Sequence, residues 1–349
     1  MSRFVTLGEI MVRLSTPGFQ RFEQALPGSL ETNFGGAEAS VAALINRLGG
    51  DAAFVTALPE NALGRSCLAT LKRQGVNVDH VLLTDKGRMG LYFVEHGVNQ
   101  RPGQVIYDRD QSSCAITPAS DYDWEAIFAD AVWLVISGIT PALSSTAADL
   151  IGVVLGEAET RGIQVACDMN YRSKLWRWHP SDSPEQLAAT TMQRIVGRID
   201  LLICGRSDAV MTLGIDDDSE IESLASEISR QYPRLSRIAM TRRRSVSSTH
   251  QSFAASLYDV NRRQMFHAPD ADGTYEITDV VDRIGTGDAF YGALLFAIDT
   301  DELSDSKSAV AFATAAACLA HSISGDFSLI SRDEIEALVQ GDGAGRIVR

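Results

Sequence analysis

Short apolar runs alternate along the chain with longer segments whose apolar residues recur at a helical period. The runs typical of strands cover residues 4–7, 53–57, 132–136, 163–167, 200–204 and 237–241. The helical segments cover residues 38–48, 61–74, 146–160, 289–298 and 307–320. Strands that are apolar throughout are usually buried on both faces, and intervening helices favour parallel pairing. The pattern therefore predicts an α/β fold with a central, mostly parallel sheet sandwiched by helices.

Two segments depart from this alternation. Residues 9–34 and 88–110 carry short β patterns without a helix of useful length. We expect them to form a small β-sheet away from the main core, and a lid over a site is one use of such a sheet. Edge hairpins or a dimer contact are the alternatives. No linker is evident, so we expect a single domain over residues 1–340 and a C-terminal tail over residues 341–349.

The composition is that of a globular protein with a large core, since 45% of the 349 residues are hydrophobic and 22% charged. The net charge of −14 argues against nucleic acid as a partner, although local arginines can attract an anionic substrate. The five cysteines include no C-x-x-C pair and the six histidines no metal-ligand spacing, so we expect neither disulfides nor a metal site. No signal peptide or bilayer-spanning run is evident, which predicts a cytoplasmic protein without a membrane partner.

The turn Gly285-Thr286-Gly287-Asp288 lies between a β-rich run and the helical segment 289–298. Backbone N–H groups at a helix start favour an anion such as phosphate, and glycine lets the anion come close. A carboxylate beside that anion suits a base that accepts a proton from an attacking hydroxyl. An ordinary helix start is the alternative, with Asp288 favoured by the helix dipole. The chain has no Gly-Lys pair, which excludes a Walker A loop.

Tyrosine and arginine side chains in the second β segment suit a sugar acid. Tyr107 and Arg109 lie close together, and Tyr92 belongs to the preceding strand-like run. A tyrosine hydroxyl contacts sugar oxygens, and an arginine fork binds a carboxylate. A surface strand with solvated ends is the alternative interpretation.

Further candidates lie at predicted helix and strand ends. Gly35 and Gly36 precede a helix and free the backbone to approach a ligand. Arg172 follows the run 163–167, at the end of a strand where open α/β sheets bind ligands. Asp326 follows the last long helix and suits either a sugar hydroxyl or a turn.

Residues 241–246 follow the predicted strand 237–241 as a loop or turn. Arg242, Arg243 and Arg244 are consecutive there, which indicates attraction for phosphate. A solvated basic turn explains the same run equally well.

Taken in order, the motifs resemble the ribokinase-like (PfkB) carbohydrate kinases over about residues 4–336, and within them the kinases of 2-keto-3-deoxygluconate. The matching elements are Leu7-Gly8-Glu9, Gly35-Gly36-Ala37-Glu38, Gly90-Leu91-Tyr92, Tyr107-x-Arg109, the eight residues from Ser137 to Ser144, Asp168-x-Asn170-Tyr171-Arg172 and Gly285-x-Gly287-Asp288. Several matches in the same order are more specific than any one of them.

The resemblance implies a ribokinase-like fold with a small β-sheet lid, and transfer of phosphate from ATP to the terminal 6-hydroxyl of the sugar acid, with Mg²⁺ carried by the nucleotide. It implies Asp288 as the base and the backbone of Gly285, Thr286 and Gly287 as an anion hole. The sugar acid would contact Gly35, Gly36, Tyr92, Tyr107, Arg109, Arg172 and Asp326. ATP would border Asn170, Asp208, Thr241, Arg242, Arg243, Val246, Gly285 and Gly287.

The nucleotide half matches the family pattern less well than the sugar half. Arg283 stands where a small residue or proline is usual, and Thr286 stands where alanine is usual. The element that usually reads Asn-x-x-Glu is Gly205-Arg206-Ser207-Asp208 in this chain, and of its residues only Asp208 is acidic. Residues 241–246 lack the usual glycines. A PfkB kinase of another sugar, fructose-like or ribose-like, and a catalytically weak sugar-binding or sensing homologue therefore stay open. Relatives often assemble, which implies a homo-oligomer, a dimer or higher.

Overall fold

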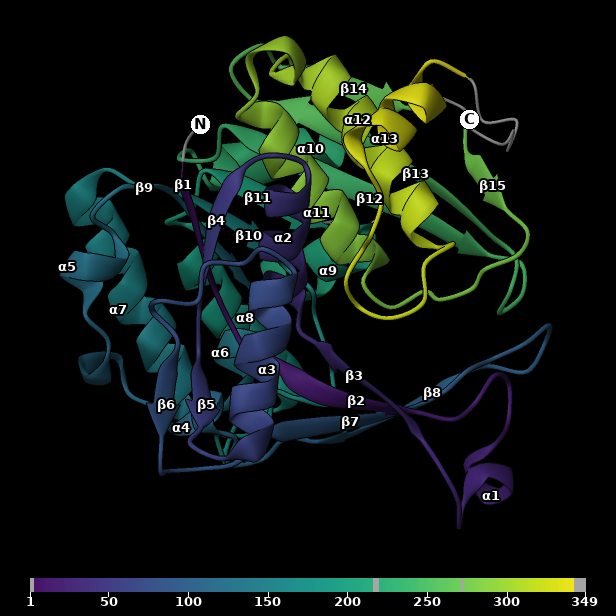
Figure 1. Cartoon of the computed structure of the whole chain (residues 1–349). Helices are drawn as coiled ribbons and strands as arrows, with labels where there is room; N and C mark the ends of the chain where they lie inside the picture. The colour runs from purple at the N-terminus through teal and green to yellow at the C-terminus, as the bar shows by residue number, and fades with distance from the viewer. Residues whose placement is uncertain (1–2, 216–219, 271–272, 342–349) are drawn as a thin grey trace.

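The computed structural model describes residues 3–215, 220–270 and 273–341 (Figure 1). The strands of its large sheet are β1 (Arg3–Leu7), β4 (Asp51–Val55), β9 (Ala131–Ser137), β10 (Gln164–Asp168), β11 (Leu201–Cys204), β12 (Arg237–Ser245), β13 (Gln251–Asp259), β14 (Gln264–Ala268) and β15 (Tyr275–Ile277). Their order is β14-β13-β12-β11-β10-β9-β1-β4, with β15 paired to β13. Pairing is parallel from β4 to β12 and antiparallel from β12 to the β14 edge. The prediction of a central, mostly parallel sheet is confirmed.

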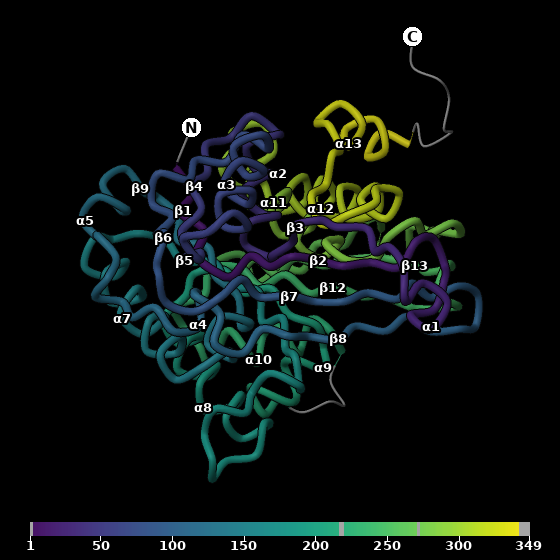
Figure 2. Tube along the Cα trace, turned by 60° about the horizontal axis from the view of Figure 1, so that its bottom comes forward, coloured from purple at the N-terminus to yellow at the C-terminus, as the bar shows by residue number. Residues whose placement is uncertain are grey.

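Helices cover both faces of this sheet. The helices of the described residues are α1 (Phe22–Ala25), α2 (Ala37–Arg47), α3 (Ala62–Arg73), α4 (Ser113–Ile116), α5 (Trp124–Ile127), α6 (Thr140–Leu143), α7 (Ser145–Arg161), α8 (Pro184–Val196), α9 (Arg206–Asp208), α10 (Ile221–Gln231), α11 (Thr286–Ile298), α12 (Ser306–Ala320) and α13 (Arg332–Val339). The short helix α1 lies away from the large sheet (Figure 1). Figure 2 shows α2, α11 and α12 on one side of the strands and α7, α8 and α10 on the other. The prediction that helices sandwich the sheet is confirmed.

Neighbouring residues of the central strands belong to two different cores. Phe4 of β1 is buried in the core that includes α2, α11 and α12, whereas Val5 is buried in the core that includes α7, α8 and α10. Side chains of a strand point alternately to the two faces, so a strand covered on both faces is apolar at most of its positions. This explains why the central strands appear in the sequence as mostly apolar runs.

The segments 9–34 and 88–110 supply a second sheet of four strands within the described residues, in the order β3-β2-β7-β8. These strands are β2 (Met11–Ser15), β3 (Glu31–Gly35), β7 (Gly90–Glu95) and β8 (Gln104–Asp108). Figure 1 shows this sheet, called the small sheet below, extending from the main body. A further pair, β5 (Ala57–Pro59) and β6 (Leu82–Thr84), is parallel.

Some sequence expectations about elements were wrong. Residues 53–57 do not form one strand, because the chain passes from β4 to β5 there. The loop expected over residues 241–246 is largely strand, because β12 pairs with β13 along its whole length up to Ser245. The sequence pattern also missed β13, β14, α8, α10 and α13. The expected tail lies, apart from Gly341, outside the described residues.

Candidate active site

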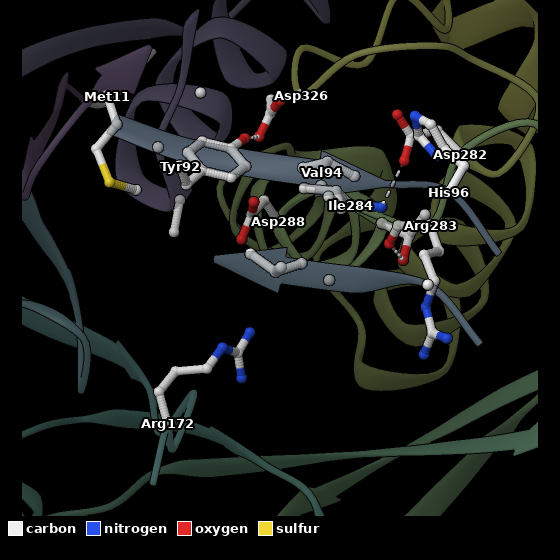
Figure 3. A pocket seen from close by; sticks show the side chains of 18 of the residues that line it. Met11, Tyr92, Val94, His96, Arg172, Asp282, Arg283, Ile284, Asp288 and Asp326 are labelled. Atoms are coloured by element: carbon white, nitrogen blue, oxygen red, sulfur yellow. Dashed lines mark hydrogen bonds between the residues drawn. The ribbon is translucent and has the colours of Figure 1, made fainter. Parts of the chain in front are cut away.

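One cavity of about 590 Å³ lies between the small sheet and the large sheet (Figure 3). Its walls come from the small sheet, from the segment after β10, from β12 and from the turn that precedes α11. Thirteen residues predicted from the sequence line it: Gly35, Gly36, Tyr92, Tyr107, Arg109, Asn170, Arg172, Arg243, Gly285, Thr286, Gly287, Asp288 and Asp326. The fold therefore gathers residues from almost the whole chain into one place.

The turn before α11 depends on glycine. Gly285 has φ of +83°, a conformation that L side chains rarely adopt. A β-carbon on Gly285 would also lie 2.6 Å from the backbone oxygen of Asp326. Gly287 is exposed to the cavity, and nothing lies within 4 Å of the position that its β-carbon would take. The start of α11 is thus open to a ligand, and its N–H groups favour an anion.

Asp288 belongs to the first turn of α11 and lines the cavity. Burial raises the pKa of its carboxyl to about 6, the charge of Asp326 adds to the rise, and Arg172 opposes it. Figure 3 shows Asp288 near the Tyr92–Asp326 pair, with Arg172 pointing into the cavity from the opposite wall. A carboxyl with this pKa is ionised at neutral pH and still basic enough to accept a proton.

Arg109 already has a carboxylate partner. Its Nε donates to Oε2 of Glu9 at 2.7 Å, and its Nη2 forms an ion pair with the same oxygen. The guanidinium also lies over the ring of Tyr107, 5.6 Å from its centre. Oε1 of Glu9 is buried and accepts no hydrogen bond from the described residues, although Glu9 lines the cavity. Glu9 was not among the predicted site residues, and its place in the Leu7-Gly8-Glu9 match was the only sequence indication.

A buried ion network joins the small sheet to the turn before α11. Arg13 of β2 donates to Asp282 at 2.6 Å and to Asp326 at 3.1 Å. Asp326 also accepts the hydroxyl hydrogen of Tyr92, and Asp282 accepts the N–H of Ile284 at 3.1 Å. The network was missed because its partners are far apart in sequence. The one indication was a charged residue, Arg13, within the apolar alternation of residues 11–14.

Two further acids, Glu38 and Asp168, line the cavity and have raised pKa values. Burial raises the pKa of Glu38 to about 7, although the hydroxyl of Ser137 donates to Glu38 at 2.5 Å. Burial raises the pKa of Asp168 to about 8, and the charges of Asp288 and Asp208 add to that rise. Neither acid was predicted to act, although both lie inside the matched motifs. Because burial favours the neutral form of Glu38 and Asp168, the cavity carries less negative charge near pH 7 than its number of acids suggests.

Only one arginine of the run 242–244 enters the cavity. Side chains alternate along β12, so Arg243 faces the cavity whereas Arg242 points to the other face and lies within 3.5 Å of Gly273 O. Nη2 of Arg243 donates to the hydroxyl of Thr286 at 2.6 Å, and that hydroxyl donates to the carbonyl of Arg283 at 3.0 Å. Thr286 and Arg283, the two departures from the family pattern at this turn, are therefore connected to Arg243.

Four predicted nucleotide-side residues do not line the cavity: Thr241, Arg242, Val246 and Asp208. Asp208 instead accepts the backbone N–H of Gly205 at 3.2 Å, which stabilises the start of α9. Across the described ranges, no group of three His, Cys, Asp or Glu side chains could hold a metal ion. No helix in the same ranges is long and apolar enough to cross a membrane.

Several known proteins are similar to this chain over nearly its whole length. The family described as pfkB family carbohydrate kinase matches residues 1–330. The 2-dehydro-3-deoxygalactonokinase of Haloferax volcanii is 35% identical over 345 residues, which cover 99% of this chain and 98% of that protein. The structure of the 2-dehydro-3-deoxygluconokinase of Thermotoga maritima is similar with a TM-score of 0.89 at 36% identity, covering 98% of this chain and 100% of that one.

A more distant structure shares the fold alone. It is the fructokinase with bound ATP from Xylella fastidiosa, with a TM-score of 0.75 at 20% identity, covering 97% of this chain and 98% of that one. The family match spans nearly the whole described chain, and the ribokinase-like fold expected from the sequence is confirmed. This chain therefore belongs to the pfkB family and is a carbohydrate kinase.

Proposed function

We propose that this kinase transfers the γ-phosphoryl group of ATP to the 6-hydroxyl of 2-keto-3-deoxygluconate, also called 2-dehydro-3-deoxygluconate. The observation that carries the proposal is the position of Asp288, ionised at neutral pH, in the same cavity as Arg109 and Tyr107. A base beside an anion-binding helix start is the arrangement that phosphoryl transfer to a hydroxyl requires.

In this mechanism Asp288 accepts the proton of the sugar hydroxyl as that oxygen attacks phosphorus. Backbone N–H groups of Gly285, Thr286 and Gly287 stabilise the charge on the transferring group, because they are fixed by the start of α11 before substrate arrives. Mg²⁺ would be held by the nucleotide phosphates and would neutralise part of their charge. Three of the four arginines that line the cavity, Arg172, Arg243 and Arg283, fit such an anionic ligand.

The opposite wall of the cavity binds the sugar acid. Arg109 binds its carboxylate, and the partnership with Glu9 fixes the orientation of the guanidinium. The unpaired Oε1 of Glu9 is an acceptor for a sugar hydroxyl, since a buried polar atom gains from a hydrogen bond that the free protein lacks. Tyr107 and Tyr92 add apolar walls with hydroxyl tips.

The epimeric acid 2-keto-3-deoxygalactonate is a second candidate substrate. It is favoured by the Haloferax volcanii relative, whose name gives that activity and whose similarity spans nearly all of this chain. A fructose-like or ribose-like ketose is less favoured, because it offers no carboxylate to Arg109. A protein that only senses sugar is less favoured too, because it has no need of Asp288 as a base.

We also propose a homo-oligomer that forms through the outer face of the small sheet. Leu14, Phe93 and Ile106 lie side by side in register there and are at least partly exposed. Ile106 alone is 45% exposed. Light scattering of wild-type protein and of Ile106→Lys tests this: an oligomer that the substitution dissociates supports the proposal, and a monomeric wild type contradicts it.

A coupled ADP-release assay over four sugars tests the proposed reaction. The panel holds 2-keto-3-deoxygluconate, its galacto epimer, fructose and ribose, each with ATP and Mg²⁺. We expect kcat/KM for the two acids to exceed that for the neutral ketoses by about 100-fold or more, because only the acids can form a charge-assisted pair with Arg109. Product phosphorylated at O6, seen by phosphorus–proton NMR, completes the assignment. Equal turnover of fructose would assign the enzyme to another sugar.

A further inference from the structure

Three arginines converge on the cavity without carboxylate partners. Arg172, Arg243 and Arg283 all line it, and within the described residues none forms an ion pair with an acid. All three side chains are exposed within the open cavity. Exposed arginines that form no ion pair keep their N–H groups available to an anion that enters the cavity, although the chain as a whole is negatively charged.

Of these three arginines, Arg243 contacts both an aromatic ring and a side-chain hydroxyl. It pairs with Phe253 across β12 and β13, and its guanidinium lies over the Phe253 ring at 5.8 Å from the centre. The Phe253 ring in turn contacts Phe290 of α11, with centres 6.2 Å apart. The head of Arg243 is fixed by the hydrogen bond to Thr286, whose own hydrogen is directed to the Arg283 carbonyl. The stem and one Nη are therefore fixed, while other N–H groups of the guanidinium remain for a ligand.

The hydrogen bond to Thr286 places this guanidinium at the start of α11. Thr286 is the first residue of that helix, two positions before Asp288. An anion bound by the helix N–H groups therefore lies within reach of Arg243 as well. A guanidinium beside backbone N–H groups suits a phosphoryl group, whose several oxygens need several donors at once.

We propose that Arg243, held by Thr286, binds the phosphoryl group while it passes from ATP to the sugar acid. This role rests on the proposed kinase reaction and adds a residue to it. As the bond from the sugar oxygen to phosphorus forms, the bond from phosphorus to the bridging oxygen of ATP breaks, and ADP leaves with that electron pair. The proton of the sugar hydroxyl goes to Asp288, and Arg243 stabilises the oxygens of the group in transit.

Substitutions at three positions test the role by kinetics. Arg243→Ala is expected to lower kcat by about 100-fold or more while KM for the sugar acid changes less than about three-fold. Arg243→Lys is expected to recover part of that loss, because an ammonium keeps the charge but not the fork. Thr286→Ala removes the tether and is expected to cost about ten-fold in kcat. Arg244→Ala is the matched control: it removes the same charge one residue away, on the other face of β12, and is expected to leave kcat within two-fold.

Calorimetric binding of tripolyphosphate, without Mg²⁺ or sugar, gives a readout independent of turnover. We expect Arg243→Ala to bind it at least about ten-fold more weakly than wild type, and Arg244→Ala to bind it equally well. The melting temperature of ligand-free Arg243→Ala is expected within about two degrees of wild type, because the lost contacts are offset by relief of repulsion.

The outcomes separate this inference from the proposed function. Wild type that binds tripolyphosphate through Arg243 but phosphorylates no sugar contradicts the kinase reaction and supports the phosphate-binding role. Equal kcat and equal tripolyphosphate affinity in Arg243→Ala and Arg244→Ala overturn the inference while the kinase reaction stands. A large fall in melting temperature for both Arg243→Ala and Arg243→Lys, with unchanged tripolyphosphate affinity, also overturns it, because Arg243 would then be structural.

Discussion

The pKa of Asp288 determines how activity should depend on pH. A base with a pKa of about 6 is roughly 90% ionised at pH 7 and roughly 10% ionised at pH 5. We therefore expect kcat/KM to fall by about ten-fold between these two pH values, with an acid limb centred near pH 6. The profile of kcat/KM reports the pKa values of the free enzyme.

Two neighbours should move this acid limb in opposite directions. Arg172 lowers the pKa of Asp288 and Asp326 raises it. Arg172→Gln should therefore shift the limb to higher pH, and Asp326→Asn should shift it to lower pH, each by roughly 0.5 to 1 pH unit. Both substitutions also weaken substrate binding, but weaker binding changes the height of the profile and not the pH of its midpoint.

The assay is steady-state ADP release at limiting sugar acid in buffers of constant ionic strength from pH 4.5 to 8.5. Enzyme preincubated at each pH and returned to pH 7.5 must recover full activity, which excludes acid denaturation as the cause of the limb. Shifts of the same sign in both variants, or a limb that neither variant moves, would refute Asp288 as the titrating base.

Three further predictions follow from single contacts. Gly285→Ala should lower stability by about 1–3 kcal/mol in urea unfolding and reduce kcat, because its φ is positive and the β-carbon would meet the Asp326 carbonyl; unchanged stability contradicts the strained turn. Because the pKa of Glu38 is raised to about 7, its contribution to stability is fully present below about pH 4.5 and is lost as pH rises through about 7. Glu38→Gln should therefore be as stable as wild type at pH 4 and more stable by about 3 kcal/mol at pH 8.5. A pH-independent difference argues against a buried, titrating Glu38. Arg109→Ala should raise KM for sugar acids at least about ten-fold more than for neutral ketoses, and equal losses would show that Arg109 does not bind the carboxylate.

The central sheet was predictable because the burial of a strand on both faces is visible in that strand's own residues. Strand β9 is covered on both faces, and this appears in the sequence as the continuous apolar run 132–136. By contrast, β12 continues into three arginines because its partner β13 supplies hydrogen bonds along all nine residues. Polar residues there look like a loop in the sequence, and only the pairing with a distant strand makes them a strand.

Some parts of the site could likewise be predicted from the sequence, and others could not. The turn Gly285–Asp288 could be predicted because a helix start with glycines has a local meaning. The partners of Arg13 could not, since Asp326 is 313 residues away and no local pattern relates them. The ion pair of Arg109 with Glu9 was hidden for the same reason, so the sequence indicated a free arginine where the fold holds a paired one.

The most direct test of the account is the Asp288→Asn variant. It is assayed for ADP release and, in parallel, for binding of 2-keto-3-deoxygluconate by calorimetry. Asparagine keeps the size of the side chain but cannot accept the hydroxyl proton, so turnover should fall by about 1,000-fold or more while the affinity for the sugar acid changes less than about three-fold. Turnover within ten-fold of wild type would contradict Asp288 as the base and, with it, the proposed mechanism.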